Sequence, residues 1–215
     1  MNWLAHLLLS EQNVESRLGN LLADLVKGTD RRELNSNIQR GIECHQVIDA
    51  FTDCHLVVQR SKKRIGSSYR RFAGILVDVF YDHFLAKNWS EYSNVPLEQF
   101  TGEIYESFQA YQGKIPAPVS KLIACMAAED WLGAYRNVAG VENTLERISN
   151  RLSMRLSRSF MLNQAVSELT THYGEFEDDF QEFFPELFFY VQNWYLLQLA
   201  SNPNRQALLG GYHQK

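Results

Sequence analysis

The sequence predicts an all-α fold, a single compact domain built from many helices. Apolar residues recur with helical spacing along the chain, and no convincing segment alternates as a strand would. Only 5 prolines and 12 glycines interrupt the 215 residues, mostly where a helix would end. Because no linker, repeat or low-complexity tract divides the chain, we expect one domain over residues 1–200 and a frayed tail over residues 201–215.

Residues that start or stop helices set the expected order of elements. Gly28 ends the second helix, Gly66–Ser68 supplies caps for the fourth, and Pro96 opens the fifth. Pro185 suits the first turn of a helix, so we expect the last helix to begin there. The helices are expected near residues 2–10, 14–27, 36–58, 68–87, 97–113, 119–128, 131–135, 141–156, 159–171, 175–184 and from 185 onward.

The bulk properties exclude several classes of protein. A formal net charge of −4 argues against nucleic acid as the main partner, and no apolar run is long enough to span a membrane. The apolar N-terminal segment has no basic region before it, so we expect no signal peptide. The 3 cysteines form no zinc-binding or paired pattern, which favours reduced thiols in a cytoplasmic protein.

Charged residues are segregated along the chain. Residues 55–77 carry basic side chains and no acid, whereas residues 168–186 carry acids and no lysine or arginine. The basic residues are Arg60, Lys62, Lys63, Arg64, Arg70 and Arg71. A basic region on an acidic protein suits the docking of an anionic partner, although ordinary solvated surface charge explains the same pattern.

Acids and histidines stand where a helical core would carry leucine or alanine. Asp24 and Asp78 are flanked by aliphatic residues. His45, Asp49 and Asp53 recur every four residues and so share one helix face. A carboxylate buried without a partner is costly, so such groups are normally neutralised, paired or bound to a metal. Imidazole and carboxylate groups on several helices suit one shared divalent ion, manganese or magnesium.

Other polar residues in these helices allow two explanations each. His6, one turn into the first helix, suits a hydrogen-bonded core histidine as well as a metal ligand. Asp53 suits a cap at a helix end as well as a place in the site. Asp82 shares a helix face with Asp78, and His83 follows it inside the same apolar stretch.

A stripe of arginines follows one face of the helix predicted over residues 141–156. Its members are Arg147, Arg151, Arg155 and Arg158. Guanidinium groups bind phosphate through paired N–H donors, so one or two of these arginines suit a substrate phosphate. Arg151, beside Asn150, is the preferred candidate, although a solvated amphipathic helix also explains the stripe.

Several short motifs occur in order up to about Tyr190. They are MNWLAHL (Met1–Leu7), GNLLAD (Gly19–Asp24), Gly41-Ile42 to His45, IDAFTD (Ile48–Asp53), DVFYDHFL (Asp78–Leu85), Trp89, Asn150-Arg151, and His172-Tyr173 leading to Phe183–Pro185. Together they resemble the acyl carrier protein phosphodiesterase family, also called acyl carrier protein hydrolases. Two departures stand out: the only neighbouring His/Asp pair is the reversed Asp82-His83, and Gln46-Val47 follows His45 where we expect basic residues.

The resemblance implies a divergent fold like that of HD phosphohydrolases, and a manganese-dependent activity. The family removes the 4′-phosphopantetheine arm from holo-acyl carrier protein and releases apo-acyl carrier protein. The carried-over residues are His6, Asp24, His45, Asp49, Asp78, Asp82 and His83. Acyl carrier proteins are small and acidic, which agrees with a basic docking region.

The combined hypothesis assigns a role to each candidate. We expect His6, Asp24, His45 and Asp78 to hold the ion, with Asp49, Asp82 and His83 as catalytic or supporting groups that include the proton donor for the leaving serine. The predicted substrate-binding residues are Arg151 and Arg147 for phosphate and Arg60, Lys63, Arg64, Arg70 and Arg71 for the carrier. Two alternatives are a phosphohydrolase of nucleotides or small phosphoesters and a non-catalytic helical module that binds acidic proteins.

Overall fold

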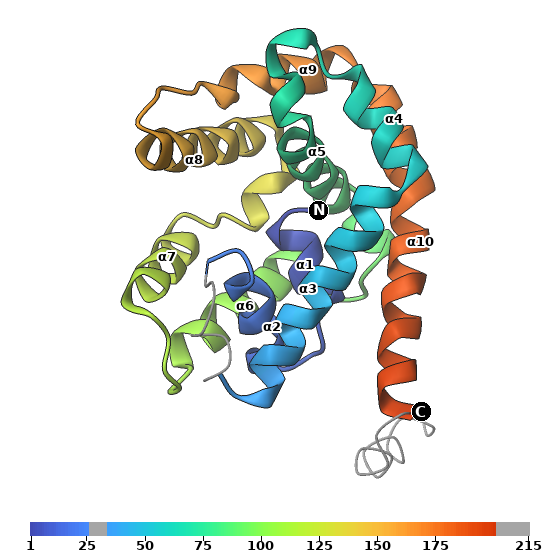
Figure 1. Cartoon of the computed structure of the whole chain (residues 1–215). Helices are drawn as coiled ribbons and strands as arrows, with labels where there is room; N and C mark the ends of the chain where they lie inside the picture. The colour runs from blue at the N-terminus through green and yellow to red at the C-terminus, as the bar shows by residue number, and fades with distance from the viewer. Residues whose placement is uncertain (26–33, 201–215) are drawn as a thin grey trace.

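Every regular element of the described residues is a helix, as the periodicity predicts (Figure 1). The structure is a computed structural model that describes residues 1–25 and 34–200. Its α-helices are α1 (Trp3–Leu9), α2 (Val14–Leu22), α3 (Ser36–Cys54), α4 (Leu56–Arg64), α5 (Ala73–Lys87), α6 (Leu97–Ala110), α7 (Ala117–Ala128), α8 (Val138–Leu156), α9 (Val166–Thr171) and α10 (Tyr173–Ala200). The 3-10 helices of the described residues are η2 (Ser67–Phe72), η3 (Trp89–Glu91), η4 (Gly133–Arg136) and η5 (Leu162–Ala165). The predicted all-α fold class is confirmed.

Helix α5 is the central element of the hydrophobic core. Its residues Leu76, Phe80 and Phe84 are completely buried, and the helix contacts α1, α4, α8 and α10. A helix packed on several sides needs apolar residues all round, which explains why α5 has no single apolar stripe. Figure 1 shows the N-terminus and α1 next to α5 near the middle of the molecule, with α10 along one side. The first residues of the chain therefore meet α5, the helix that carries Asp78 and Asp82.

Helices α2 and α3 pack with their backbones in close contact. A Cβ atom on Gly19 would lie 2.0 Å from the carbonyl oxygen of Ile38, and one on Gly41 would lie 2.0 Å from that of Ser16. Any larger residue at either position would push the helices apart, so both positions require glycine. The close approach brings Asn20 of α2 within hydrogen-bond distance of His45 of α3.

The third helix ends earlier than predicted. Helix α3 stops at Cys54, and His55 takes an extended conformation before α4 begins at Leu56. The imidazole of His55 accepts a hydrogen bond from the Val57 N–H and so caps α4. Periodicity does not reveal this break, because apolar residues on both helices continue the same spacing across it.

The prediction that Pro185 begins the last helix is wrong. Helix α10 runs from Tyr173 to Ala200 with Pro185 inside it. A proline in a helix interior removes one hydrogen bond and costs about 3 kcal/mol. On both sides of Pro185 the helix is anchored by completely buried side chains, which are Phe180, Phe183, Phe184 and Leu187. Each such side chain contributes roughly 2 kcal/mol on burial, which offsets the cost of the proline.

Two expectations fall on residues that the structure does not describe. They are residues 26 and 27 of the helix predicted over residues 14–27 and the tail over residues 201–215. Within the described residues, α2 already ends at Leu22 and residues 23–25 form a turn, so this helix ends earlier than predicted. Among the described helices, none combines the length and apolarity that crossing a membrane would require. All three cysteines are unpaired: Cys44 is buried, and Cys54 and Cys125 are exposed.

Candidate functional site

Two histidines from different helices stack against each other below the protein surface. The buried rings of His6 in α1 and His45 in α3 have centroids 4.2 Å apart. Asn20 of α2 joins them, because its Oδ1 lies 2.9 Å from His6 Nδ1 and 3.0 Å from His45 Nδ1. The Nδ2 of Asn20 donates to the His6 carbonyl and to Ser10, which fixes the orientation of the amide. Since Oδ1 only accepts, each Nδ1 carries a hydrogen, and each Nε2 is left for another partner.

Two carboxylates face these Nε2 atoms. His45 Nε2 lies 3.0 Å from Asp49 Oδ2 and 3.4 Å from Asp24 Oδ1, and His6 Nε2 lies 3.3 Å from Asp49 Oδ1. Asp24 also accepts a hydrogen bond of 3.3 Å from Trp3 Nε1. The ligand atoms of His6, His45 and Asp49 all lie within 4.8 Å of one another, which suits a shared metal ion. We call these three residues together with Asp24 the imidazole–carboxylate cluster.

The charges of this cluster move the pKa values of its members in opposite directions. Burial acts to lower the pKa of His45, but hydrogen bonds to Asp24 and Asp49 and their charges raise it to about 9. Burial dominates at His6 and lowers its pKa. Burial acts to raise the pKa of Asp49, but hydrogen bonds with His45 and His6 hold it far below its usual range. Without a metal, His45 is therefore the protonated imidazole, with a hydrogen on both ring nitrogens. His6 is neutral, and the lone pair of its Nε2 faces a carboxylate oxygen.

A cavity of about 370 Å³ opens beside the cluster, and we call it the polar cavity. Asp24 lines it from the turn after α2, His45 and Asp49 line it from α3, and Arg151 and Arg155 line it from α8. Carboxylate, imidazole and guanidinium groups thus meet in one cavity. This combination suits a phosphate ester, because the arginines can bind its oxygens while the cluster holds a cation.

Asp78 lines the polar cavity, but its carboxylate is already engaged. Its Oδ1 accepts a hydrogen bond of 2.9 Å from the buried amino group of Met1, and 33% of its side chain is exposed. Burial raises the pKa of Asp78, although the charge of the amino group opposes this effect. The structure therefore brings Asp78 to the same cavity as Asp24 and His45, with Met1 as its direct partner.

Asp82 is completely buried and binds the first turn of α1. Its Oδ2 accepts from Leu4 N at 2.7 Å, and its Oδ1 accepts from Asn2 N at 3.2 Å and Ala5 N at 3.4 Å. The first N–H groups of a helix have no partner inside the helix, so Asp82 caps α1 from α5. Burial raises the pKa of Asp82 to about 7. Asp82 lines neither the polar cavity nor the second cavity described below, and its contacts position the helix that carries His6.

His83 points to a different part of the molecule. Its Nδ1 lies 2.7 Å from the Tyr135 carbonyl oxygen and its Nε2 lies 2.8 Å from the Tyr173 hydroxyl. Burial lowers its pKa, so the ring is neutral near pH 7. The structure places His83 with η4 and α10, outside the imidazole–carboxylate cluster and outside both cavities.

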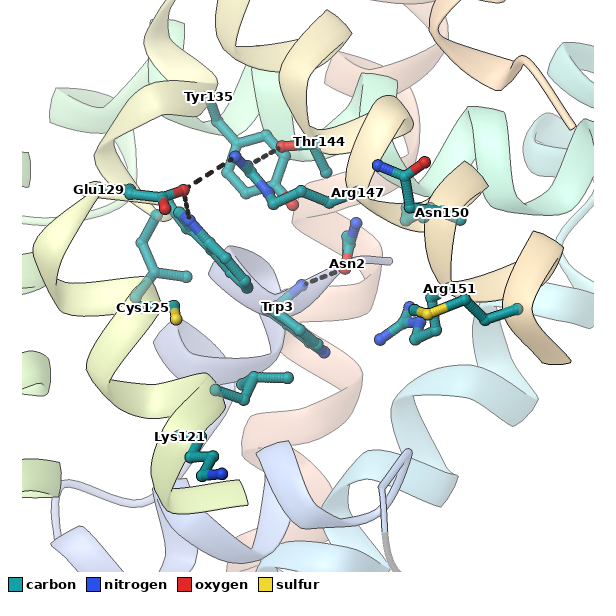
Figure 2. Close-up of a pocket in the computed structure, with 15 residues that line it drawn as sticks. Asn2, Trp3, Lys121, Cys125, Glu129, Tyr135, Thr144, Arg147, Asn150 and Arg151 are labelled. Atoms are coloured by element: carbon teal, nitrogen blue, oxygen red, sulfur yellow. Dashed lines mark hydrogen bonds and ion pairs between the residues drawn. The ribbon is translucent and has the colours of Figure 1, made fainter. Parts of the chain in front are cut away.

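A second cavity, of about 450 Å³, shares Asn2, Ile148 and Arg151 with the polar cavity (Figure 2). We call it the apolar cavity, because most of its wall is apolar. Trp3 and Trp131 stack in this wall with their ring centroids 6.2 Å apart. The guanidinium carbon of Arg151 lies 5.8 Å from the centre of the Trp3 ring, which places Arg151 between the two cavities.

Arg147 lines only the apolar cavity, and its guanidinium group is occupied. Its carbon lies 4.4 Å from the centre of the Trp131 ring, and its Nη2 donates to Thr144 Oγ1 at 2.9 Å. A carboxylate oxygen of Glu129 lies 3.9 Å from its Nη1. Of the two arginines predicted to bind phosphate, Arg151 borders the polar cavity and Arg147 does not.

A model of the acyl carrier protein phosphodiesterase family matches residues 1–187. The chain belongs to this family. A phosphodiesterase hydrolyses a phosphoric diester bond, so membership classifies the chain as a hydrolase.

Individual relatives agree with this assignment. The chain is 30% identical over 209 residues to the acyl carrier protein phosphodiesterase of Photorhabdus laumondii, covering 97% of this chain and 99% of the relative. It is 33% identical over 188 residues to proteins of the same name in Escherichia coli O157:H7 and Escherichia coli K12, covering 87% of this chain and 95% of each relative. No solved structure matches the chain, so the HD-phosphohydrolase-like architecture stays a prediction.

The basic segment predicted for this family member is partly neutralised by its own fold. Arg60 and Arg64 of α4 both form ion pairs with the buried Asp179 of α10, and Arg60 also pairs with Glu182. Because α4 packs against α10, the basic and acidic segments face each other. Among the described residues, the ion pairs do not include Lys63, Arg70 or Arg71, and all three side chains are exposed.

Sequence reasoning assigned no role to two kinds of residue in this acyl carrier protein phosphodiesterase family member. Asn20 stands one helical turn before Asp24 inside an apolar stretch, and this spacing is a usable signal for a buried polar group. The stacked Trp3 and Trp131 are 128 positions apart in the sequence, and no local pattern predicts their contact.

Proposed function

We propose that the chain hydrolyses the phosphodiester that joins the 4′-phosphopantetheine arm to a serine of holo-acyl carrier protein. The products are apo-acyl carrier protein and free 4′-phosphopantetheine. Family membership supports the substrate, since the relatives carry that name. The observation that carries the proposal is the imidazole–carboxylate cluster beside a cavity that Arg151 also lines.

We further propose that the cluster binds a divalent cation. Mn²⁺ is the preferred ion, and Mg²⁺ is the alternative. Both Nδ1 atoms are committed to Asn20, so both Nε2 atoms can act as ligands. Two stacked imidazoles cannot both be protonated without repulsion, and a neutral His6 faces Asp49 with its lone pair. A cation would remove the repulsion between the imidazoles and the repulsion between the His6 lone pair and Asp49. Its ligands would be His6, His45, Asp49 and Asp24.

The protein groups around the cluster have separate tasks in this proposal. A divalent cation, when bound, polarises a phosphoryl oxygen and lowers the pKa of water. Arg151 binds a phosphate oxygen at the border of the polar cavity. Asp78 is the carboxyl that can exchange a proton with the leaving serine oxygen, because it lines the cavity and burial raises its pKa. Asp82 holds α1, and with it His6, in position.

The exposed cations of the basic segment that form no ion pair with the described residues are the proposed contacts for the carrier. Lys63 of α4 and Arg70 and Arg71 of η2 precede α5, the helix that brings Asp78 to the polar cavity. An acidic carrier would be attracted to this segment, and its modified serine would be oriented toward the cavity. We leave Arg60 and Arg64 out of this role, because both form ion pairs with Asp179.

The mass of the carrier protein tests the proposal directly. Holo-acyl carrier protein incubated with the enzyme and Mn²⁺ is expected to lose the mass of its arm, and free 4′-phosphopantetheine is expected in the filtrate. EDTA should stop the reaction, and added Mn²⁺ should restore it. An unchanged carrier mass together with hydrolysis of nucleotides would overturn the proposed substrate.

A further inference from the structure

The two cavities adjoin each other beside α8. Asn2, Ile148 and Arg151 line both of them, so a ligand held at these residues borders both spaces. The polar cavity ends at the imidazole–carboxylate cluster, and the apolar cavity extends past Trp3 and Trp131 to α7. A ligand with an anionic group at one end and an uncharged chain behind it would therefore place its two parts in different surroundings.

The wall of the apolar cavity suits an uncharged chain with a few polar groups. Trp3, Trp131, Leu122 and Ile148 supply apolar surface, and Asn2 supplies a side-chain amide (Figure 2). Three cations line the cavity: Lys121 and Arg151 are exposed, and the half-buried Arg147 is occupied by Thr144 and Trp131. With Arg151 beside the first phosphate, a second phosphate group would find no free cation below the surface, whereas amide groups and methyl groups would find partners. The volume of about 450 Å³ lies within the range of roughly 300–1,000 Å³ typical of small-molecule sites.

We propose that the apolar cavity binds the pantetheine part of the arm while the phosphodiester lies beside Arg151. This inference rests on the proposed function, because it takes holo-acyl carrier protein as the substrate. Pantetheine is an uncharged chain with two amides, hydroxyl groups and a geminal dimethyl group. It matches a largely apolar wall with a few polar side chains better than a nucleotide does, since a nucleotide carries further charge or a sugar with many hydroxyls. The thiol end of the arm then points along α7, where Cys125 lines the same wall.

Variants that fill the cavity test this placement by kinetics. Leu122→Phe and Cys125→Phe add bulk on α7 at positions that line the apolar cavity, and neither side chain is part of the fully buried core. Ala128→Phe adds the same bulk to an exposed position of α7 that lines neither cavity. We expect kcat/KM for arm release to fall at least tenfold in both filling variants and to stay within twofold of wild type in the control. Arm release within twofold of wild type in both filling variants would overturn the placement.

Two further measurements show whether a loss of activity comes from misfolding, from a wrong proposed function, or from a wrong location for pantetheine. The filling variants should keep their helix content by circular dichroism and bind Mn²⁺ as wild type does, since no residue of the cluster lies on α7. Pantetheine, which lacks the phosphate, should bind to wild type in a calorimetric titration and bind at least tenfold more weakly to Cys125→Phe. If wild type releases no arm, the proposed function fails. The titration then tests by itself whether the apolar cavity binds pantetheine. Equal binding to both proteins, or no binding to wild type, would overturn the inference.

Discussion

The imidazole–carboxylate cluster and the Asp82-His83 pair have similar compositions and opposite surroundings. Both place acids and histidines in helices that are otherwise apolar. Asp82 uses its two oxygens for three backbone N–H groups, and His83 uses both ring nitrogens for Tyr135 and Tyr173. In the cluster, by contrast, His6 and His45 contact Asn20 through Nδ1 and turn Nε2 toward the carboxylates of Asp49 and Asp24 beside a cavity.

The difference shows that a polar residue in an apolar helix has two distinct outcomes. A buried group that is satisfied by the fold itself stabilises the protein, because removing it leaves its partners unpaired. A group whose ligand atoms meet those of other side chains beside a cavity is available for a cation or a substrate. We therefore expect substitutions in the two regions to separate activity from stability.

The largest effect on activity is expected for Asp49→Asn. The amide cannot bind a cation between His6 and His45 as the carboxylate does, so kcat should fall about 10³-fold, equivalent to about 4 kcal/mol. Circular dichroism should show unchanged helix content. Glu43→Gln is the matched control, because Glu43 is an exposed acid of the same helix that lines neither cavity. Wild-type turnover by Asp49→Asn would remove the cluster from the mechanism.

The largest effect on stability is expected for Asp82→Ala. Three backbone N–H groups at the start of α1 would lose their acceptor, which should lower the free energy of unfolding by about 3 kcal/mol. Equilibrium unfolding in urea measures this loss, and Asp82→Asn, which keeps one acceptor oxygen, should lose less. An unchanged urea midpoint with abolished turnover would instead support the chemical role first predicted for Asp82.

A smaller loss of stability is expected for His83→Leu. The substitution removes the hydrogen bonds to Tyr135 and Tyr173 and should cost about 2 kcal/mol in urea unfolding. Because His83 lies outside both cavities, kcat/KM should stay within about threefold of wild type. A hundredfold loss of kcat with normal stability would restore His83 as the proton donor.

The cluster should bind Mn²⁺ more tightly as pH rises. Burial acts to lower the pKa of metal-free His45, but Asp24 and Asp49 raise it to about 9, so a cation must displace this proton. Between pH 6 and 8 the apparent affinity should rise about tenfold per pH unit and level off near pH 9. Calorimetry in buffers of different ionisation enthalpy counts the released protons. A pH-independent affinity would contradict a cation on His45 Nε2.

The basic segment also contains cations with and without ion pairs. Substitutions there are expected to have the smallest effects on KM and stability. Arg70→Glu should raise KM for the carrier about threefold to fivefold at low salt and have little effect at high salt, since exposed charges are screened. Arg64→Gln should chiefly lower stability, because it leaves the buried Asp179 with one cation fewer. Equal KM values for Arg70→Glu and wild type at low salt would exclude Arg70 from docking.

Local patterns in the sequence were sufficient for the fold class and for half of the site. Helical spacing predicted most helices, because each helix is stabilised along its own length by an apolar face. It did not predict the helix break at His55, whose side chain caps α4. It also placed a helix start at Pro185, where buried aromatic neighbours keep α10 continuous. Polar residues in apolar helices correctly pointed to His6, Asp24 and His45 as neighbours.

The sequence by itself determined that the chain is all-α, that it resembles a phosphodiesterase family, and which acids and histidines interrupt its apolar stretches. Only the tertiary structure decided that Asp49 joins the two imidazoles, that Asp82 caps α1, and that Arg60 and Arg64 are neutralised by α10. The physical reason is that periodicity reports on one helix at a time. Which groups meet depends on how helices pack, as when Gly19 and Gly41 let α2 approach α3 and bring Asn20 to His45.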